Sequence, residues 1–194
     1  GSGLWMRLLR GLQVFDRVPA ERVHRLFYPQ VPAVVTASYG DEVGGLLATS
    51  IIPVSMNPCL IGVALGRDHR TTRLVEMSDC FGVCWVSYEQ VERLSKLAQP
   101  VPAHVKDKLR ECGFSYGRGR VVGVPVLNEA AAWIECVVSW RREAGDHVFY
   151  VGTVEAAFAI DDFREYWSFR KYRPVLYVGG ARADWPKYVR FPLE

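Results

Sequence analysis

Apolar runs rich in β-branched residues follow one another at close intervals along this chain, with no regular alternation between strands and helices. A parallel sheet needs a crossover of a dozen or more residues, usually a helix, between its strands. The spacing therefore predicts a mainly β, β-rich α+β fold: a split antiparallel β-barrel of Greek-key type with peripheral helices. The predicted strands cover residues 31–38, 43–52, 59–65, 81–87, 131–140, 148–158 and 174–178.

Helical periodicity is confined to short segments between these strands. It is clearest in residues 89–98, where Val91, Leu94 and Leu97 share one face of a helix. Residues 114–125 and 141–147 are predicted as connections, the first because it is rich in glycine. The other predicted helices cover residues 6–12, 20–27, 71–78, 105–112 and 164–171.

The composition indicates one folded domain. The chain has 194 residues, of which 49% are hydrophobic and 23% charged, which is enough to fill a single core. We expect an N-terminal extension over residues 1–28, in which residues 1–3 resemble the remnant of an expression tag. The domain itself is expected over residues 29–194.

Charge and hydropathy exclude two classes of partner. The net charge is +3, and no run of lysine and arginine resembles a nucleic-acid footprint. No apolar segment reaches the ~18 residues of a membrane span, and no signal peptide is visible. Five cysteines, mostly in strand-like apolar surroundings, indicate reduced thiols. We therefore expect a cytoplasmic protein that binds neither nucleic acid nor membrane.

Two familiar motifs are incomplete. Gly117, Gly119 and Gly123 nearly form a GxGxxG fingerprint, but the third glycine comes one residue late and the strand-to-helix context is missing. A flexible loop is the better interpretation. Cys80 and Cys84 have no second cysteine or histidine pair to complete a metal site, so we interpret them as core residues and predict no metal.

Donor side chains flank the predicted strand at residues 59–65. Thr49 and Ser50 precede it, and a basic, hydroxyl-rich loop with Arg70 and Thr71 follows it. Guanidinium, hydroxyl and backbone N–H donors that converge are suited to a phosphate, and a helix starting at Thr71 would add its dipole. The pattern favours a ligand with a phosphate at one end and a flat apolar ring at the other. For either cluster taken alone, a helix cap at Thr71 and a solvated Arg70 are the better explanation.

The order of these residues resembles the flavin reductase-like FMN-binding family of split-barrel flavin reductases, flavoredoxins and ferric reductases. Residues 48–59 are similar to the family's AxS–apolar–x-VS-x-x-PP segment, with Cys59 in place of the second proline. Residues 145–154 are similar to its GDH-x-x-x-x-G-x-V motif, and residues 174–180 to its closing PL-x-Y-x-GG. The resemblance covers about residues 29–180.

The resemblance implies FMN as cofactor and NADH or NADPH as reductant, bound at a homodimer interface. His147 is expected to contact the nicotinamide or its phosphates. No catalytic acid or base is implied, because hydride transfer depends on positioning. By the same resemblance, Ala48, Thr49, Ser50, Ile51, Ile52 and Ser55 are expected to bind the ring and ribityl chain, and Asp68, His69, Arg70 and Thr71 the phosphate.

The implied function is an NAD(P)H:flavin oxidoreductase that passes reduced flavin to a monooxygenase, to ferric iron or to another acceptor. Two alternatives stay open. One is a flavoredoxin-like FMN electron carrier that is reduced by a protein partner. The other is a split-barrel domain that binds no flavin.

Overall fold

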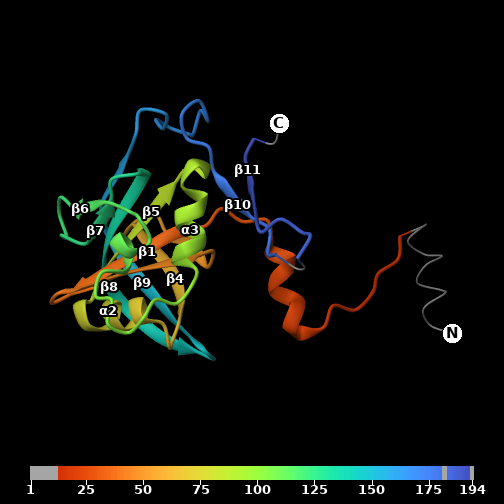
Figure 1. Ribbon diagram of the computed structural model, residues 1–194, viewed down its shortest axis with the longest axis horizontal. Coiled ribbons are helices and arrows are strands. Elements are labelled where there is room, and N and C mark those ends of the chain that lie inside the picture. Colours follow the sequence, from red (N-terminus) through yellow and green to blue (C-terminus); the bar gives the residue numbers. More distant parts are fainter. Residues whose placement is uncertain (1–12, 181–182, 193–194) are drawn as a thin grey trace.

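Seven antiparallel strands form the main sheet in the computed structural model, which describes residues 13–180 and 183–192. The tag remnant and the helix predicted at residues 6–12 lie outside the described residues. Figure 1 labels most of these elements along the chain. The strands are β1 (Ala33–Tyr39), β2 (Glu42–Ala48), β3 (Ile51–Ser55), β4 (Leu60–Gly66), β5 (Cys80–Val86), β8 (Ala130–Ala144) and β9 (His147–Ala159).

The order of strands makes the sheet a split barrel. The sheet runs β2-β1-β5-β8-β9-β4-β3, and every neighbouring pair is antiparallel. Its two edge strands, β2 and β3, follow one another in the chain and are joined by only Thr49 and Ser50. A sheet whose edges are joined by two residues must curl until those edges approach. The predicted fold class is confirmed.

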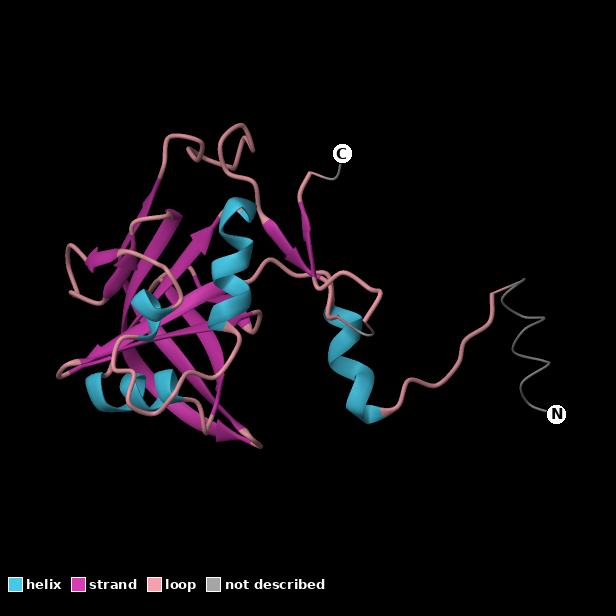
Figure 2. Ribbon diagram, viewed as in Figure 1, coloured by secondary structure: helices cyan, strands magenta, loops and turns pink. Residues whose placement is uncertain are grey.

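Short helices and hairpins surround this sheet, and Figure 2 shows the helices on its outside. None of the helices in the described residues is long and apolar enough to cross a membrane. The helices are η1 (Ala20–Phe27), α2 (Arg70–Ser78), η2 (Tyr88–Gln90), α3 (Val91–Leu97) and α4 (Lys108–Glu111). The small hairpins pair β6 (Tyr116–Arg118) with β7 (Pro125–Leu127), and β10 (Val175–Tyr177) with β11 (Tyr188–Arg190).

Both faces of β1 are buried, which explains why its sequence is an almost unbroken apolar run. Val35 packs into one cluster together with Leu74 of α2, and Val34 packs into a second cluster together with Leu94 of α3 and Leu109 of α4. A strand covered on both sides loses the alternation of apolar and polar residues that a half-buried strand shows. α2 therefore lies firmly against the barrel, which fixes the position of its N-terminus.

The segment before β1 extends away from the barrel (Figure 1). It contains η1, as predicted, and docks at its end through Arg25, which donates a 3.1 Å hydrogen bond to the carbonyl oxygen of Gly179. The ring of Tyr28 lies edge-on to that of Tyr177, with 4.9 Å between centroids. The boundary at residue 28 stays a prediction.

Three sequence predictions need correction. The strand predicted at residues 43–52 is two strands, because the chain turns at Ser50. Residues 164–171 form no helix, and Phe169, at a φ of 60°, has a backbone conformation that a right-handed helix does not allow. The connection predicted at residues 141–147 is only the turn of Gly145 and Asp146, since β8 and β9 continue almost to each other.

The glycine-rich segment at residues 114–125 wraps around a buried carboxylate. Successive backbone N–H groups of Arg120, Val121 and Val122 donate to Glu135 on β8 at 2.8–3.0 Å, and the indole of Trp133 donates at 3.1 Å. Such a run of N–H groups is an anion-binding nest. The near-miss glycine fingerprint is a loop, as the sequence predicts, and its backbone N–H groups bind an internal anion, Glu135.

The five cysteines are free. Burial raises the pKa of the Cys84 and Cys136 thiols to about 12, so both remain neutral and behave as core residues.

Candidate functional site

The joint between β2 and β3 is the first part of the candidate site. The hydroxyl of Ser50 donates a 2.6 Å hydrogen bond to the carbonyl oxygen of Ala64 on β4, and the N–H of Ala64 donates in return to the Ser50 carbonyl at 3.0 Å. Ala48 before the joint is buried, whereas Ser50 is exposed and Ile52 is 53% exposed. The joint thus presents backbone, a small polar side chain and an apolar side chain at the surface.

The loop after β4 and the first turn of α2 form the second part. The hydroxyl of Thr72 donates a 2.6 Å hydrogen bond to the carbonyl oxygen of Gly66, which ties the start of the helix to the end of β4. Asp68 and His69 are exposed, and the helix has no side-chain cap from the described residues at His69. The first N–H groups of an α-helix have no intrahelical acceptor and favour a bound anion.

Thr71 is turned into the protein. Its side chain is 1% exposed and packs against β2, where a Cβ on Gly44 would lie 2.8 Å from the Thr71 hydroxyl oxygen. Thr71 therefore does not present its hydroxyl to a ligand at the surface.

The guanidinium of Arg70 contains a donor without an acceptor. Its Nη2 donates to the carbonyl oxygen of Ala103 at 3.0 Å, and its Nε lies 3.9 Å from Oε2 of Glu42. Its Nη1 is buried and has no hydrogen-bond partner in the described part of the chain. Leaving a buried donor unpaired costs about 1–3 kcal/mol. An anionic group bound at this nitrogen would remove that penalty.

The tip of the β8–β9 hairpin is the third part. The imidazole of His147 is 47% exposed, and its Nδ1 lies 2.7 Å from Oδ1 of Asp146. This hydrogen bond holds the pKa of Asp146 below its ordinary value. The guanidinium of Arg67 donates to the carbonyl oxygen of Gly145, and the Arg67 backbone N–H donates to that of Asp146 at 3.0 Å. The tip is therefore fastened to the loop that precedes α2.

All three parts meet at the end of β4. Ser50 is bonded to Ala64, Thr72 is bonded to Gly66, and His147 pairs with Gly66 in the ladder between β4 and β9. A Cβ at Gly66 would lie 2.4 Å from the ring of His69, so any side chain there would require the His69 ring to move. The predicted residues on these three segments are Ala48, Thr49, Ser50, Ile51, Ile52, Asp68, His69, Arg70, Thr71 and His147.

One predicted residue lies apart from this group, and one contributor was missed. Ser55 pairs with Leu60 beside the β3–β4 turn, at the other end of β4. Arg67 was not predicted as a site residue, although its basic side chain lies in the loop that the sequence had singled out. Only the structure shows that Arg67 connects this loop to the hairpin tip, because the two segments are far apart in the sequence.

Comparison with known proteins decides the family. The sequence model described as "Flavin reductase like domain" matches residues 24–183. The chain belongs to this family. An uncharacterized protein of Aeropyrum pernix is 35% identical over 173 residues, and the chain spans 66% of that relative while the match covers 89% of this chain. An NADH-dependent FMN reductase of Streptomyces nodosus subsp. asukaensis is 28% identical over 66% of this chain and 67% of its own length.

Solved structures of flavin reductases have the same fold. The NADH:FAD oxidoreductase SgcE6 of Streptomyces globisporus superposes with a TM-score of 0.74 at 25% identity, over 92% of this chain and 98% of its own. The split-barrel assignment therefore rests on the observed strand order and on a solved relative together.

The residues of this flavin reductase-like chain fit a flavin that carries a phosphate. Such a cofactor has an anionic end and a flat, largely apolar ring. The unpaired nitrogen of Arg70 and the uncapped first turn of α2 are suited to the anionic end. The joint from Ala48 to Ile52 offers backbone groups, the exposed Ser50 and the exposed apolar side chain of Ile52 for the ring.

Proposed function

We propose that this chain is an NAD(P)H:flavin oxidoreductase that binds FMN and uses NADH or NADPH as reductant. The observation that supports this most is the convergence of Ser50, the start of α2 and His147 on the last residues of β4. Reduced flavin then passes to a monooxygenase, to ferric iron or to another acceptor.

Each segment has one task in this proposal. FMN, when bound, supplies the acceptor for the hydride of the nicotinamide. Arg70 and the first-turn N–H groups of α2, with Asp68 and His69 beside them, hold the phosphate. Residues 48–52 support the ring, and His147 orients the nicotinamide. Because the reaction depends on stacking and orientation, no side-chain acid or base is needed.

The test is anaerobic reduction of FMN by the purified full chain. We expect the visible absorption band of oxidised flavin to bleach on addition of NADH or NADPH at catalytic protein concentration. If FMN binds but neither nucleotide bleaches it, while a reduced redox protein does, the chain is an FMN electron carrier instead. Absence of FMN binding would rule out both functions.

Replacement of His147 by alanine separates reductant binding from flavin binding. We expect kcat/KM for NADH or NADPH to fall about tenfold, roughly the 1.4 kcal/mol of one polar contact, with FMN affinity unchanged. His24→Ala, on an exposed histidine of the N-terminal segment, serves as the control. An unchanged kcat/KM in His147→Ala would contradict the assigned role. Steady-state kinetics and FMN fluorescence titration measure the two quantities.

We further propose a homodimer that forms through the outer face of β3, β4 and β9. Val54 on β3 is 43% exposed, and the ring of Phe149 on β9 lies over Gly62, where a Cβ would be 2.4 Å from it. Trp140 on β8 is 48% exposed, with its ring 5.9 Å from that of Phe149. A contiguous exposed apolar ridge of this kind marks a protein–protein contact.

Val54→Asp is expected to convert the dimer to a monomer, because it buries a carboxylate without a partner. Size-exclusion chromatography with light scattering should give twice 21.9 kDa for the unmodified chain and 21.9 kDa for the variant. Tyr166→Asp, at an exposed aromatic residue away from the ridge, should remain dimeric. A monomeric unmodified chain, or a dimeric Val54→Asp, would disprove this interface.

A further inference from the structure

A second concavity lies at the opposite end of the β8–β9 hairpin from His147. Its volume is about 660 Å³, which is within the range of sites for small organic molecules. Its floor is formed by Ala132, Trp133 and Ile134 of β8 and by the last residues of β9, beginning at Ala157. At about 3.3 Å per residue, Ala157 is roughly 30 Å along the strand from His147. The cavity is therefore separate from the end of β4.

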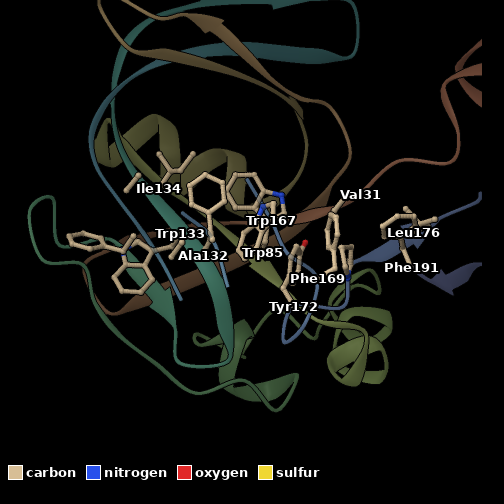
Figure 3. A pocket seen from close by; sticks show the side chains of 15 residues that line it. Val31, Trp85, Ala132, Trp133, Ile134, Trp167, Phe169, Tyr172, Leu176 and Phe191 are labelled. Carbon is tan, nitrogen blue, oxygen red and sulfur yellow. The ribbon is translucent and has the colours of Figure 1, made fainter. Parts of the chain in front are cut away.

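Aromatic side chains dominate the lining, and none of the described lining residues is charged. Figure 3 shows the side chains of Trp85, Trp167 and Tyr172 near one another at the cavity. The indole of Trp133 is already used, because it donates to Glu135. The lining residues are Val31, Trp85, Ala132, Trp133, Ile134, Ala157, Phe158, Ala159, Phe163, Trp167, Phe169, Tyr172, Pro174, Leu176 and Phe191.

One nearby cation, Arg120, lies over two aromatic rings of the lining. The guanidinium carbon of Arg120 lies 4.6 Å from the ring centroid of Phe158 and 5.7 Å from that of Trp133. Arg120 itself does not line the cavity. A bound molecule would therefore meet aromatic faces and a few neutral donors, so an ion would lose its hydration without gaining a partner.

A buried aspartate organises one wall. Asp162 is 6% exposed, and its carboxylate accepts hydrogen bonds from the hydroxyl of Ser168 and from the N–H groups of Arg170 at 3.1 Å and Tyr172 at 2.9 Å. Burial alone would raise the pKa of this carboxyl, but the hydrogen bonds outweigh burial and lower the pKa to about 2. The carboxylate stays ionised at neutral pH and fixes the loop.

The aromatic residues of this loop also pack on one another. Ring centroids lie 5.2 Å apart between Phe163 and Trp167, 4.4 Å between Trp167 and Tyr172, and 6.5 Å between Phe169 and Tyr172. A wall whose side chains are already held by their neighbours loses little conformational entropy when a ligand binds. The cavity is thus preformed.

We propose that this cavity binds a small, neutral, planar aromatic molecule that carries one hydrogen-bonding oxygen. The ring of such a molecule stacks on the aromatic walls, and its oxygen accepts from an indole or phenol donor among the lining residues Trp85, Trp167 and Tyr172. The proposal does not depend on the proposed function, because it requires neither flavin nor nicotinamide nucleotide to bind.

The test is isothermal titration calorimetry of the purified full chain, without added flavin, with 2-naphthol. We expect saturable binding in the micromolar range. The probe 2-naphthoate has the same ring system with a carboxylate, and we expect it to bind at least tenfold more weakly. Ala157→Phe, at an exposed strand position in the lining, is expected to weaken 2-naphthol binding at least tenfold by filling the cavity. Ala98→Phe, which adds the same ring at the exposed end of α3, should bind normally.

Several results would overturn the proposal. One is the absence of binding heat at any protein concentration. Another is equal affinity in the unmodified chain and Ala157→Phe, or equal affinity for the two naphthalene probes. Displacement of 2-naphthol by FMN would assign the cavity to the flavin ring. A loss of binding as the chain dimerises would assign it to a second copy. If Ala157→Phe fails to fold, Trp167→Leu, which removes a wall ring, must show the loss.

Discussion

Glu135→Ala is expected to lower the free energy of unfolding by about 3–5 kcal/mol, the range found when one partner of a buried charged interaction is removed. Glu135 is fully buried on β8, and four N–H groups donate to its two oxygens. Alanine leaves these donors without an acceptor and leaves a cavity beneath the loop of Gly119–Gly123. For a chain of this size, the melting temperature should fall by roughly 6–20 °C. Circular dichroism measures the change.

An exposed glutamate on the neighbouring strand provides the control. Glu155→Ala on β9 should change the free energy of unfolding by less than about 0.5 kcal/mol. A melting temperature for Glu135→Ala within 2 °C or so of the unmodified chain would contradict the structural role of the nest.

Acidification should narrow the difference in melting temperature between the unmodified chain and Glu135→Ala. Burial raises the pKa of Glu135, but the hydrogen bonds from Val122, Val121, Trp133 and Arg120 outweigh burial, so the pKa is lowered overall. A carboxyl whose folded pKa is depressed contributes stability above its unfolded pKa of about 4.3, and that contribution is lost as the pH falls through the folded pKa. The gap in melting temperature should therefore be full at pH 7 and shrink below about pH 4.

Arg70→Gln is expected to weaken FMN binding by about 10- to 100-fold. This is the loss expected for one or two charge-assisted hydrogen bonds, at about 1.4 kcal/mol per factor of ten. The buried Nη1 of Arg70 has no acceptor among the described residues. Replacing Arg70 by glutamine therefore removes this donor and leaves no protein acceptor unpaired at that position. Fluorescence quenching of FMN on titration with protein measures the affinity.

Riboflavin and a neighbouring arginine provide the controls. Riboflavin has the same ring but no phosphate, so Arg70→Gln should leave its affinity unchanged. Arg73→Gln removes a guanidinium one turn away that is paired with the same Glu42, at 2.7 Å, and it should leave FMN affinity within about threefold. If Arg70→Gln weakens riboflavin and FMN equally, Arg70 supports the fold of the site and does not contact the phosphate.

The strands were predictable where packing decides the sequence, and less so where it does not. β1, β4 and β5 are buried on both faces, so their apolar runs are visible. The outer part of β8 and β9 carries exposed Arg142 and Glu143, which read as a connection although the ladder continues to Ala144 and His147. The helix predicted at residues 164–171 fails because Asp162 collects the hydrogen bonds of this segment instead.

The sequence predicted which residue types form the candidate site, but not which way their side chains point. The sequence placed Thr71 and Arg70 together, yet one side chain is buried against Gly44 while the other reaches Ala103 and Glu42. Side-chain direction depends on tertiary packing, which a single sequence does not state. The aromatic cavity was not foreseen, because its residues come from five separate parts of the chain.

The three parts of the site meet at the end of β4 through main-chain atoms of β4. These are the carbonyl oxygens of Ala64 and Gly66 and the backbone of Gly66, which pairs with His147. Substitutions in the side chains of β4 therefore leave these main-chain contacts intact. Contacts made by main-chain atoms do not depend on side-chain identity and can persist as sequences diverge. Relatives that have kept about a third of their residues can thus inherit the same geometry from very different strands.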